Sequence, residues 1–141
     1  SKSGEFIYDR PFLWGSKRTG PDLHRLGGKY PDSWHYNHML DPESMSPGSI
    51  MPPYPWLLEN DLDTTYTDAK IKVLQQLGTP YPEGYAEIAN QDLREQALSV
   101  AESLRKDGIE QERLEDKEIV ALIAYLQRLG TDIKPKPQAE N

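Results

Sequence analysis

Met51 lies in a segment that is suited to hold a side chain in a fixed place, because prolines follow it at positions 52, 53 and 55. Each proline fixes its own φ and removes a backbone donor, and the residue before each proline is pushed toward extended backbone. The segment therefore predicts a stiff, extended loop that presents the thioether of Met51. A thioether can ligate a soft metal, haem iron among them. The alternative, which is commoner for methionine, is that Met51 fills a gap in the core.

Aromatic, basic and carbonyl groups accompany this loop. Tyr54 and Trp56 add large apolar surface, which a mobile surface loop does not normally carry. Arg18 follows Lys17, and the pair is either solvated or contacts an anion, since arginine makes paired hydrogen bonds to carboxylates and phosphates. Pro21 has a carbonyl but no N–H, so the carbonyl is free to accept a bond from elsewhere.

The three histidines offer a different chemistry. His35 and His38 are three residues apart on a predicted helix, and His24 lies upstream. Together they could form a small zinc site. Solvated or capping histidines are far commoner than ligands, so the metal site is the minor hypothesis.

Helical segments must position these groups, and four are predicted from periodicity and terminal residues. They span residues 30–40, 68–77, 90–107 and 117–129. Thr67 and Asp116 are the predicted N-caps of helices 68–77 and 117–129. Gly78, Gly108 and Gly130 are the predicted stops of helices 68–77, 90–107 and 117–129. No strand pattern is evident, so the fold class is all-α.

The last predicted helix is the core helix, and the third is expected to be peripheral. Apolar residues recur at helical spacing through 117–129, whereas the stripe of 90–107 is thin and rich in alanine. The segments 41–49 and 57–67 are expected to be a turn-rich stretch and a polar linker. The proline-rich tail, residues 134–141, is expected to be disordered.

Composition limits the possible functions. The 141 residues suffice for one domain, and 36% of them are hydrophobic, which predicts a small core. A net charge of -7 argues against nucleic acid and favours a basic or neutral partner. The chain has no cysteine and no apolar run long enough to span a bilayer. No nucleophile–base or carboxylate pair has catalytic spacing, so no catalysis by this chain alone is expected.

Three motifs occur in one order: Gly20-Pro21-Asp22-Leu23, Met51-Pro52-Pro53-Tyr54, and the run from Ile123 to Gly130. Together they resemble the downstream part of a class I cytochrome c domain. Residues 8–23 and 51–57 are more closely similar to subunit II of cbb-type cytochrome c oxidases, a membrane-anchored monohaem cytochrome c. The resemblance covers about residues 4–130 and is weaker over about 79–114, which is expected to be an insertion.

The resemblance implies a role for each motif residue. Met51 matches the methionine that ligates the sixth position of haem iron. Pro21 matches the proline whose carbonyl holds the proximal histidine. Leu23, Tyr54 and Trp56 would line the haem pocket. Arg18 could approach a propionate, which we infer from its charge and its place in the motif.

One departure from the family pattern concerns haem attachment. The family carries Cys-X-X-Cys-His at the end of an N-terminal helix, and this sequence has neither. None of the three histidines follows such a motif, so none inherits the proximal role. The expected reading is a partial cytochrome c-like domain over residues 1–133 that has lost the attachment motif, the first helix and the membrane anchor. No covalently bound haem is then expected in these residues.

The function that the resemblance implies is electron transfer through one c-type haem toward the catalytic subunit of the oxidase. Its partners would be the catalytic and dihaem subunits and an electron-donor cytochrome, on the periplasmic side of the bacterial inner membrane. The alternative is a haem-free docking or structural module. Loss of the first helix would leave Ile119, Ile123 and Leu126 bare, which predicts self-association through that face.

Overall fold

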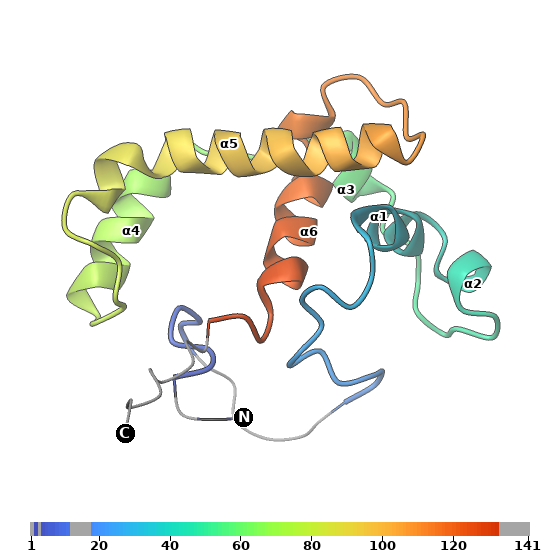
Figure 1. Cartoon of the computed structure of the whole chain (residues 1–141), viewed down its shortest axis with the longest axis horizontal. Coiled ribbons are helices and arrows are strands. Elements are labelled where there is room, and N and C mark those ends of the chain that lie inside the picture. Colours follow the sequence, from blue (N-terminus) through green and yellow to red (C-terminus); the bar gives the residue numbers. More distant parts are fainter. Residues whose placement is uncertain (1, 3, 12–17, 133–141) are drawn as a thin grey trace, which may run out of the picture.

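Every regular element in the described part of the chain is a helix (Figure 1). The computed structural model describes residues 2, 4–11 and 18–132. The elements are α1 (Asp32–Leu40), α2 (Pro42–Met45), α3 (Trp56–Glu59), α4 (Thr67–Gln76), α5 (Tyr85–Lys106), the 3₁₀ turn η1 (Leu114–Asp116) and α6 (Glu118–Arg128). Within these residues the nearest approach to a strand is an isolated antiparallel bridge between Asp61 and Lys117. The all-α prediction is confirmed, while the predicted tail 134–141 and Lys17 lie outside the described residues.

The glycine stops are confirmed, and two predicted caps are wrong. Gly78, Gly108 and Gly130 follow α4, α5 and α6 with φ of +84°, +88° and +82°, the left-handed region that favours glycine. Thr67 is the first residue of α4, and its hydroxyl donates to the Thr64 carbonyl at 3.0 Å. Asp116 belongs to η1, and its carboxylate accepts from the Arg113 guanidinium at 3.1 Å. Neither side chain is therefore available to cap a helix.

Two single-turn helices were not predicted. Within the expected turn-rich stretch, α2 starts at Pro42, and the Asp41 carboxylate accepts from the backbone N–H of Ser44 at 3.4 Å. Proline in the first turn and aspartate at the N-cap both favour a helix start. At the head of the expected linker, α3 begins at Trp56, directly after Pro55. These turns are too short for apolar periodicity to reveal them.

The longest helix, α5, is not peripheral as the sequence suggested. It begins at Tyr85, five residues before the predicted start, and its Ala101 and Leu104 are fully buried. Figure 1 shows α5 running across the molecule, with α6 beneath it and α4 under one end. The alanine stripe, which looked too weak to bury, allows α5 to approach α6 closely because alanine adds little volume.

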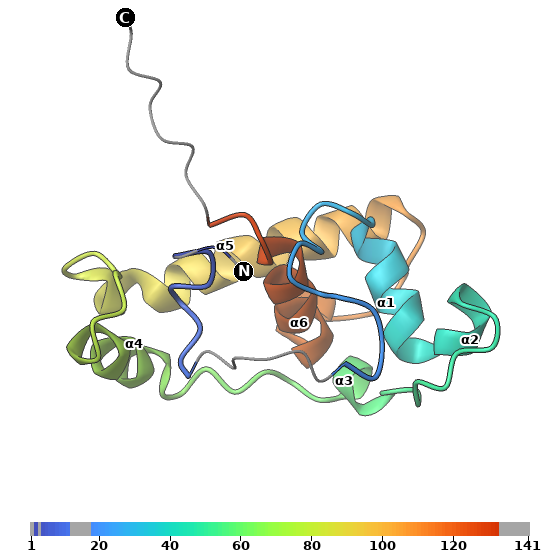
Figure 2. The same cartoon turned by 90° about the horizontal axis from the view of Figure 1, so that it is seen from below.

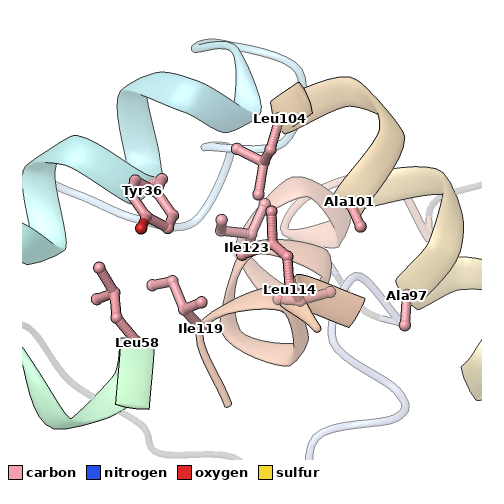
Figure 3. Packing of buried hydrophobic residues seen from close by; sticks show 9 residues of the cluster. Tyr36, Leu58, Ala97, Ala101, Leu104, Leu114, Ile119 and Ile123 are labelled. Carbon is pink, nitrogen blue, oxygen red and sulfur yellow. The ribbon is translucent and has the colours of Figure 1, made fainter. Parts of the chain in front are cut away.

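Around α6 lies the main core (Figure 3). Ile119 and Ile123 of α6 are both 0% exposed. They pack with buried residues of α1, α3, α5 and η1, namely Tyr36, Leu58, Ala97, Ala101, Leu104 and Leu114. The expectation of a bare face is therefore wrong. Leu126 is buried as well, in a second cluster with Leu26 and Leu129, so the three residues expected to mediate self-association are not exposed.

Helix α1 packs against α6. Tyr36 of α1 lies in the main core with Ile119 and Ile123, and Met39 packs against both that core and the Leu126 cluster. Figure 2 shows the segment that precedes α1 lying beside α6, and the chain after α2 passing on to α3. The Pro21 segment therefore leads into α1, and the Met51 loop connects α2 to α3.

Candidate functional site

The Met51 loop is anchored to the end of α1. The backbone N–H of Tyr54 donates to the Met39 carbonyl at 2.8 Å, and the N–H of Met51 donates to the Ser49 hydroxyl at 3.2 Å. Gly48 turns the chain into the loop with φ of +80°. Met51 is half-buried, and the prolines that follow it are exposed. The loop therefore has a fixed place relative to α1, as the proline pattern predicted.

Two aromatic rings stand beside Met51 in the sequence and pack on each other. The rings of Tyr54 and Trp56 meet edge to face, with centroids 5.1 Å apart. Tyr54 is half-buried, but Trp56, the first residue of α3, is 48% exposed. They supply apolar surface next to the loop, while the enclosure expected of a pocket wall is not formed by the described residues of this chain.

The segment around Pro21 presents its groups to the surface. Pro21 is exposed, and within the described residues its carbonyl accepts no hydrogen bond. Leu23 is 48% exposed. Its neighbour Leu26 is buried against Leu126 and Leu129. A carbonyl without a donor and an exposed leucine are thus presented on the same short stretch.

Arg18 is paired with a carboxylate. Its guanidinium lies 3.2 Å from the Asp22 carboxylate, on an exposed part of the surface. The pKa of Asp22 is held below its usual range, first by the backbone N–H of His24 and then by the Arg18 charge. The predicted propionate contact of Arg18 would have to compete with this pair.

The Pro21 segment is docked on the end of α6 by glycine contacts that the sequence did not suggest. The N–H of Gly27 donates to the Leu129 carbonyl at 2.9 Å. A Cβ on Gly27 would lie 2.4 Å from the Gln127 carbonyl oxygen, and one on Gly130 would lie 2.8 Å from the His24 carbonyl oxygen. Gly130 was predicted as a helix stop. For both glycines the structure shows a further reason, which is backbone-to-backbone packing.

Gln127 of α6 fixes the residues between this segment and α1. Its side-chain carbonyl accepts from the Gly28 N–H at 2.9 Å, and its amide donates to the Tyr30 carbonyl and the Asp32 carboxylate, both at 2.8 Å. Gln127 lies within the third motif, but the sequence assigned its side chain no role. A glutamine on a helix is common, and the partners of this one are 95 or more residues away.

A cleft of about 480 Å³ lies next to Leu23 and His24. Its wall is completed by the N-terminal segment and α6, with Phe6, Tyr8, Tyr125 and Leu129 among the lining residues. Met51, Tyr54 and Trp56 do not line it. The structure therefore does not bring all six predicted site residues to one cavity of the described chain; it divides them between the α6 end and the α1–α3 region.

The predicted three-histidine metal site is not formed. Among the described residues, no group of three or more histidine, aspartate, glutamate or cysteine side chains has a metal-binding arrangement. His24 packs on Phe6, with ring centroids 5.1 Å apart, whereas His35 and His38 pack on Trp34. The three rings therefore belong to two different surroundings.

His35 is buried and His38 is half-buried on α1, and neither was assigned to the haem site from the sequence. His35 is 1% exposed. Among residues 2, 4–11 and 18–132, neither its Nε2 nor the covered Nδ1 of His38 has a hydrogen-bond partner. Burial lowers the pKa of both imidazoles; for His35, the Asp32 carboxylate opposes this effect and His38 adds to it. Both rings are therefore neutral near pH 7.

The motif residues fit part of a haem site. Met51 supplies a thioether on an anchored loop, Leu23 and Trp56 supply exposed apolar surface, and Pro21 supplies a carbonyl without a donor. Thioether attachment of haem requires cysteine, and the 141 residues contain none. The residues present suit an iron ligand and an apolar wall. The sequence contains no cysteine to which haem could be bonded covalently.

Comparison with known proteins identifies the family of the chain. The family model described as "Cytochrome C oxidase, mono-heme subunit/FixO" matches residues 1–133. A search of curated proteins finds no match. The matched region includes all of the motif residues discussed above. The chain therefore belongs to the family of mono-haem subunits of cytochrome c oxidase, FixO.

Proposed function

We propose that this chain forms the sixth-ligand side of a single c-type haem and passes electrons through it toward the catalytic subunit of a cbb-type oxidase. Family membership supports a mono-haem oxidase subunit. The observation that carries the finer proposal is the anchored Met51 loop, in which the Tyr54 N–H is bonded to the Met39 carbonyl at 2.8 Å. A ligand on such a loop needs little reorganisation when the metal changes its charge.

Each motif residue has a separate part in this proposal. Met51 would hold the iron, and the Pro21 carbonyl would accept a hydrogen bond from a proximal histidine. Leu23, Tyr54 and Trp56 keep water from the haem face. When bound, the haem supplies a one-electron couple whose potential is raised by Met/His ligation.

The charges and partners follow from the same proposal. The chain carries a net charge of -7, which suits a basic electron donor. Its partners in the complex would be the catalytic and dihaem subunits, on the periplasmic side of the bacterial inner membrane. No helix in the described ranges is long and apolar enough to cross a bilayer.

The test is replacement of Met51 in the haem-loaded subunit, produced with the family's Cys-X-X-Cys-His motif. Met51→Ala should abolish the weak near-infrared band of sulfur-to-iron coordination in the oxidised protein and lower the reduction potential. Met45→Ala is the matched control, because Met45 ends the single-turn helix α2 and, unlike Met51, is not directly followed by a proline. Met39 is a poor control since it packs into two core clusters.

The outcomes separate the alternatives. If the band persists in Met51→Ala and vanishes in Met45→Ala, the iron ligand has been assigned to the wrong methionine. If the subunit never binds haem although the attachment motif is present, the haem-free docking module is the correct function.

A further inference from the structure

Gln111 lies in the connection between α5 and η1, and its side chain bonds to two other helices at once. Its amide oxygen accepts from the Tyr36 hydroxyl of α1 at 2.7 Å, and its amide nitrogen donates to the Leu58 carbonyl of α3 at 2.6 Å. Gln111 is half-buried, whereas Tyr36 and Leu58 are each 8% exposed. One side-chain amide therefore links α1 to α3.

Both partners of Gln111 are polar groups of the main core that need a hydrogen bond. A carbonyl in the last turn of a helix has no partner within that helix. The N–H of Leu62, four residues after Leu58, donates to the Asp116 carbonyl instead. Burial raises the pKa of Tyr36, so its hydroxyl keeps its proton and donates it. Gln111 satisfies a buried acceptor and a buried donor with one group.

The Met51 loop runs between the helices that Gln111 joins. It follows α2 and ends at α3, and the N–H of Tyr54 is bonded to the Met39 carbonyl, three residues from Tyr36 on α1. Residues 54–58 are therefore linked to α1 at two places, directly through Met39 and indirectly through Gln111. A shift of the loop relative to α1 would have to break one of these links.

The backbone on either side of Gln111 is itself anchored. The N–H of Ile109 donates to the Leu104 carbonyl at 3.1 Å, at the end of α5. The Arg113 guanidinium lies 3.1 Å from the carboxylate of Asp61, two residues after α3. The glutamine is thus presented from a connection that cannot simply follow α3 if α3 moves.

Apolar packing also joins α1 and α3, because Tyr36 and Leu58 belong to the main core. Burial of apolar surface is non-directional, whereas a hydrogen bond weakens steeply outside a narrow range of angle and distance. Gln111 therefore adds a directional restraint on the spacing of the two helices, which packing alone does not supply.

We propose that Gln111 is a positioning residue for Met51, which holds α3 against α1 and so restrains the loop that presents the thioether. The inference rests on the proposed function and gives the segment 79–114 a part in that site. Displacement of the thioether by another ligand requires the loop to move, and the two Gln111 bonds oppose this movement.

The test measures how readily added imidazole displaces the thioether in the oxidised, haem-loaded subunit, produced as for the Met51 test. Gln111→Met keeps the length of the side chain and removes both bonds. The affinity for imidazole should rise by about tenfold, since two hydrogen bonds of ordinary net strength no longer oppose the movement. Tyr36→Phe removes one of the two bonds and should give a smaller rise. Absorbance titration gives the dissociation constants.

Gln75→Met is the matched control. The Gln75 amide also donates to a backbone carbonyl, that of Pro82 at 2.8 Å, but at the end of α4. Its replacement should leave the affinity for imidazole unchanged, even if it lowers the urea midpoint of the haem-free chain. Loss of global stability alone does not change which ligand a folded subunit prefers. Met51→Ala sets the upper limit, because no thioether then has to be displaced.

Each outcome supports or overturns one of the two assignments. A rise in affinity in Met51→Ala but not in Gln111→Met overturns the inference and leaves the proposed function standing. An affinity that Met51→Ala leaves unchanged overturns the ligand assignment, and the inference with it. Equal rises in Gln111→Met and Gln75→Met show a general loosening of the fold and overturn the inference. If Gln111→Met does not fold, Tyr36→Phe decides: a rise of about threefold supports the inference, and no rise overturns it.

Discussion

Single residues control how closely two backbone segments approach at the end of α6. Gly27 and Gly130 face carbonyl oxygens at distances that a side chain would not tolerate. Gly27 does not need glycine for its backbone angle, since its φ is not positive. Its requirement is therefore steric and comes from a partner about 100 residues away in the sequence.

Replacing Gly27 with alanine should destabilise the chain by roughly 1–3 kcal/mol, because the new Cβ would lie 2.4 Å from the Gln127 carbonyl oxygen and 2.7 Å from that of Leu129. Urea unfolding measures the change. Gly20→Ala is the control, since nothing lies within 4 Å of a Cβ there, and it should stay within about 1 kcal/mol of the parent. Equal effects of the two substitutions would contradict the close approach.

The buried histidines should make stability depend on pH between about 7 and 5. Their pKa values are lowered by burial, so below the ordinary histidine value of about 6.5 the unfolded chain binds more protons than the folded one. The free energy of unfolding should therefore fall as pH falls through this range, by at most about 1.4 kcal/mol per pH unit for each histidine.

His35→Leu should flatten this dependence. The carboxylates with lowered pKa, such as Asp61 beside Lys117, lose their contribution only below about pH 4. Stability that is constant from pH 7 to 5 in the parent chain would show that the histidines are accessible to solvent.

At the level of elements, α5 completes the core that α6 begins. The expected bare face of α6 is covered because Ala97, Ala101 and Leu104 recur on one side of α5. The predicted insertion over 79–114 contains all of α5. In this chain, residues of the segment are part of the main core.

Leu104→Ala should cost about 2–5 kcal/mol of unfolding free energy, because Leu104 is 0% exposed and the change leaves a cavity between α5 and α6. Leu98→Ala on the same helix makes the same chemical change at a site that is 47% exposed, and its effect should be below about 1 kcal/mol. Chemical denaturation of both variants gives the comparison. A similar loss in the two would mean that α5 does not pack as described.

The whole molecule consists of a main core and a smaller arm. The core gathers α6 with parts of α1, α3, α5 and η1, whereas the α4–α5 end has its own cluster of Ile71, Ala86 and Ala89. Figure 1 shows α4 under the far end of α5, away from α1. Because α5 runs through both, the arm is joined to the core by a continuous helix, although its own buried surface is small.

The protection of backbone amides from hydrogen exchange should therefore differ between helices. Protection should be highest in α6 and in the C-terminal half of α5, which share fully buried residues, and lower in α4, whose cluster buries one isoleucine and two alanines. Exchange followed by mass spectrometry would resolve these segments. Protection in α4 equal to that in α6 would show that the arm and the core open as one unit.

Features that depend on neighbouring residues could be predicted from the sequence. The helix over 117–129, the glycine stops and the stiff loop at Met51 all follow from local constraints, namely apolar spacing, positive φ and the fixed φ of proline. The family motifs were equally local, since each is a contiguous run. Helix N-caps were predicted less accurately. Asp116 and Thr67 bond to Arg113 and to the Thr64 carbonyl, and not to the N–H groups at a helix start.

Only the tertiary structure decided which surfaces meet. The sequence could not show that the alanine stripe of α5 covers α6, that Gln127 bonds to Gly28 across 99 residues, or that His35 is buried with a free nitrogen. Each of these depends on groups that are far apart in the chain and brought together by folding. Their energy comes from burial and from satisfying polar groups in three dimensions, and no local pattern in the sequence records it.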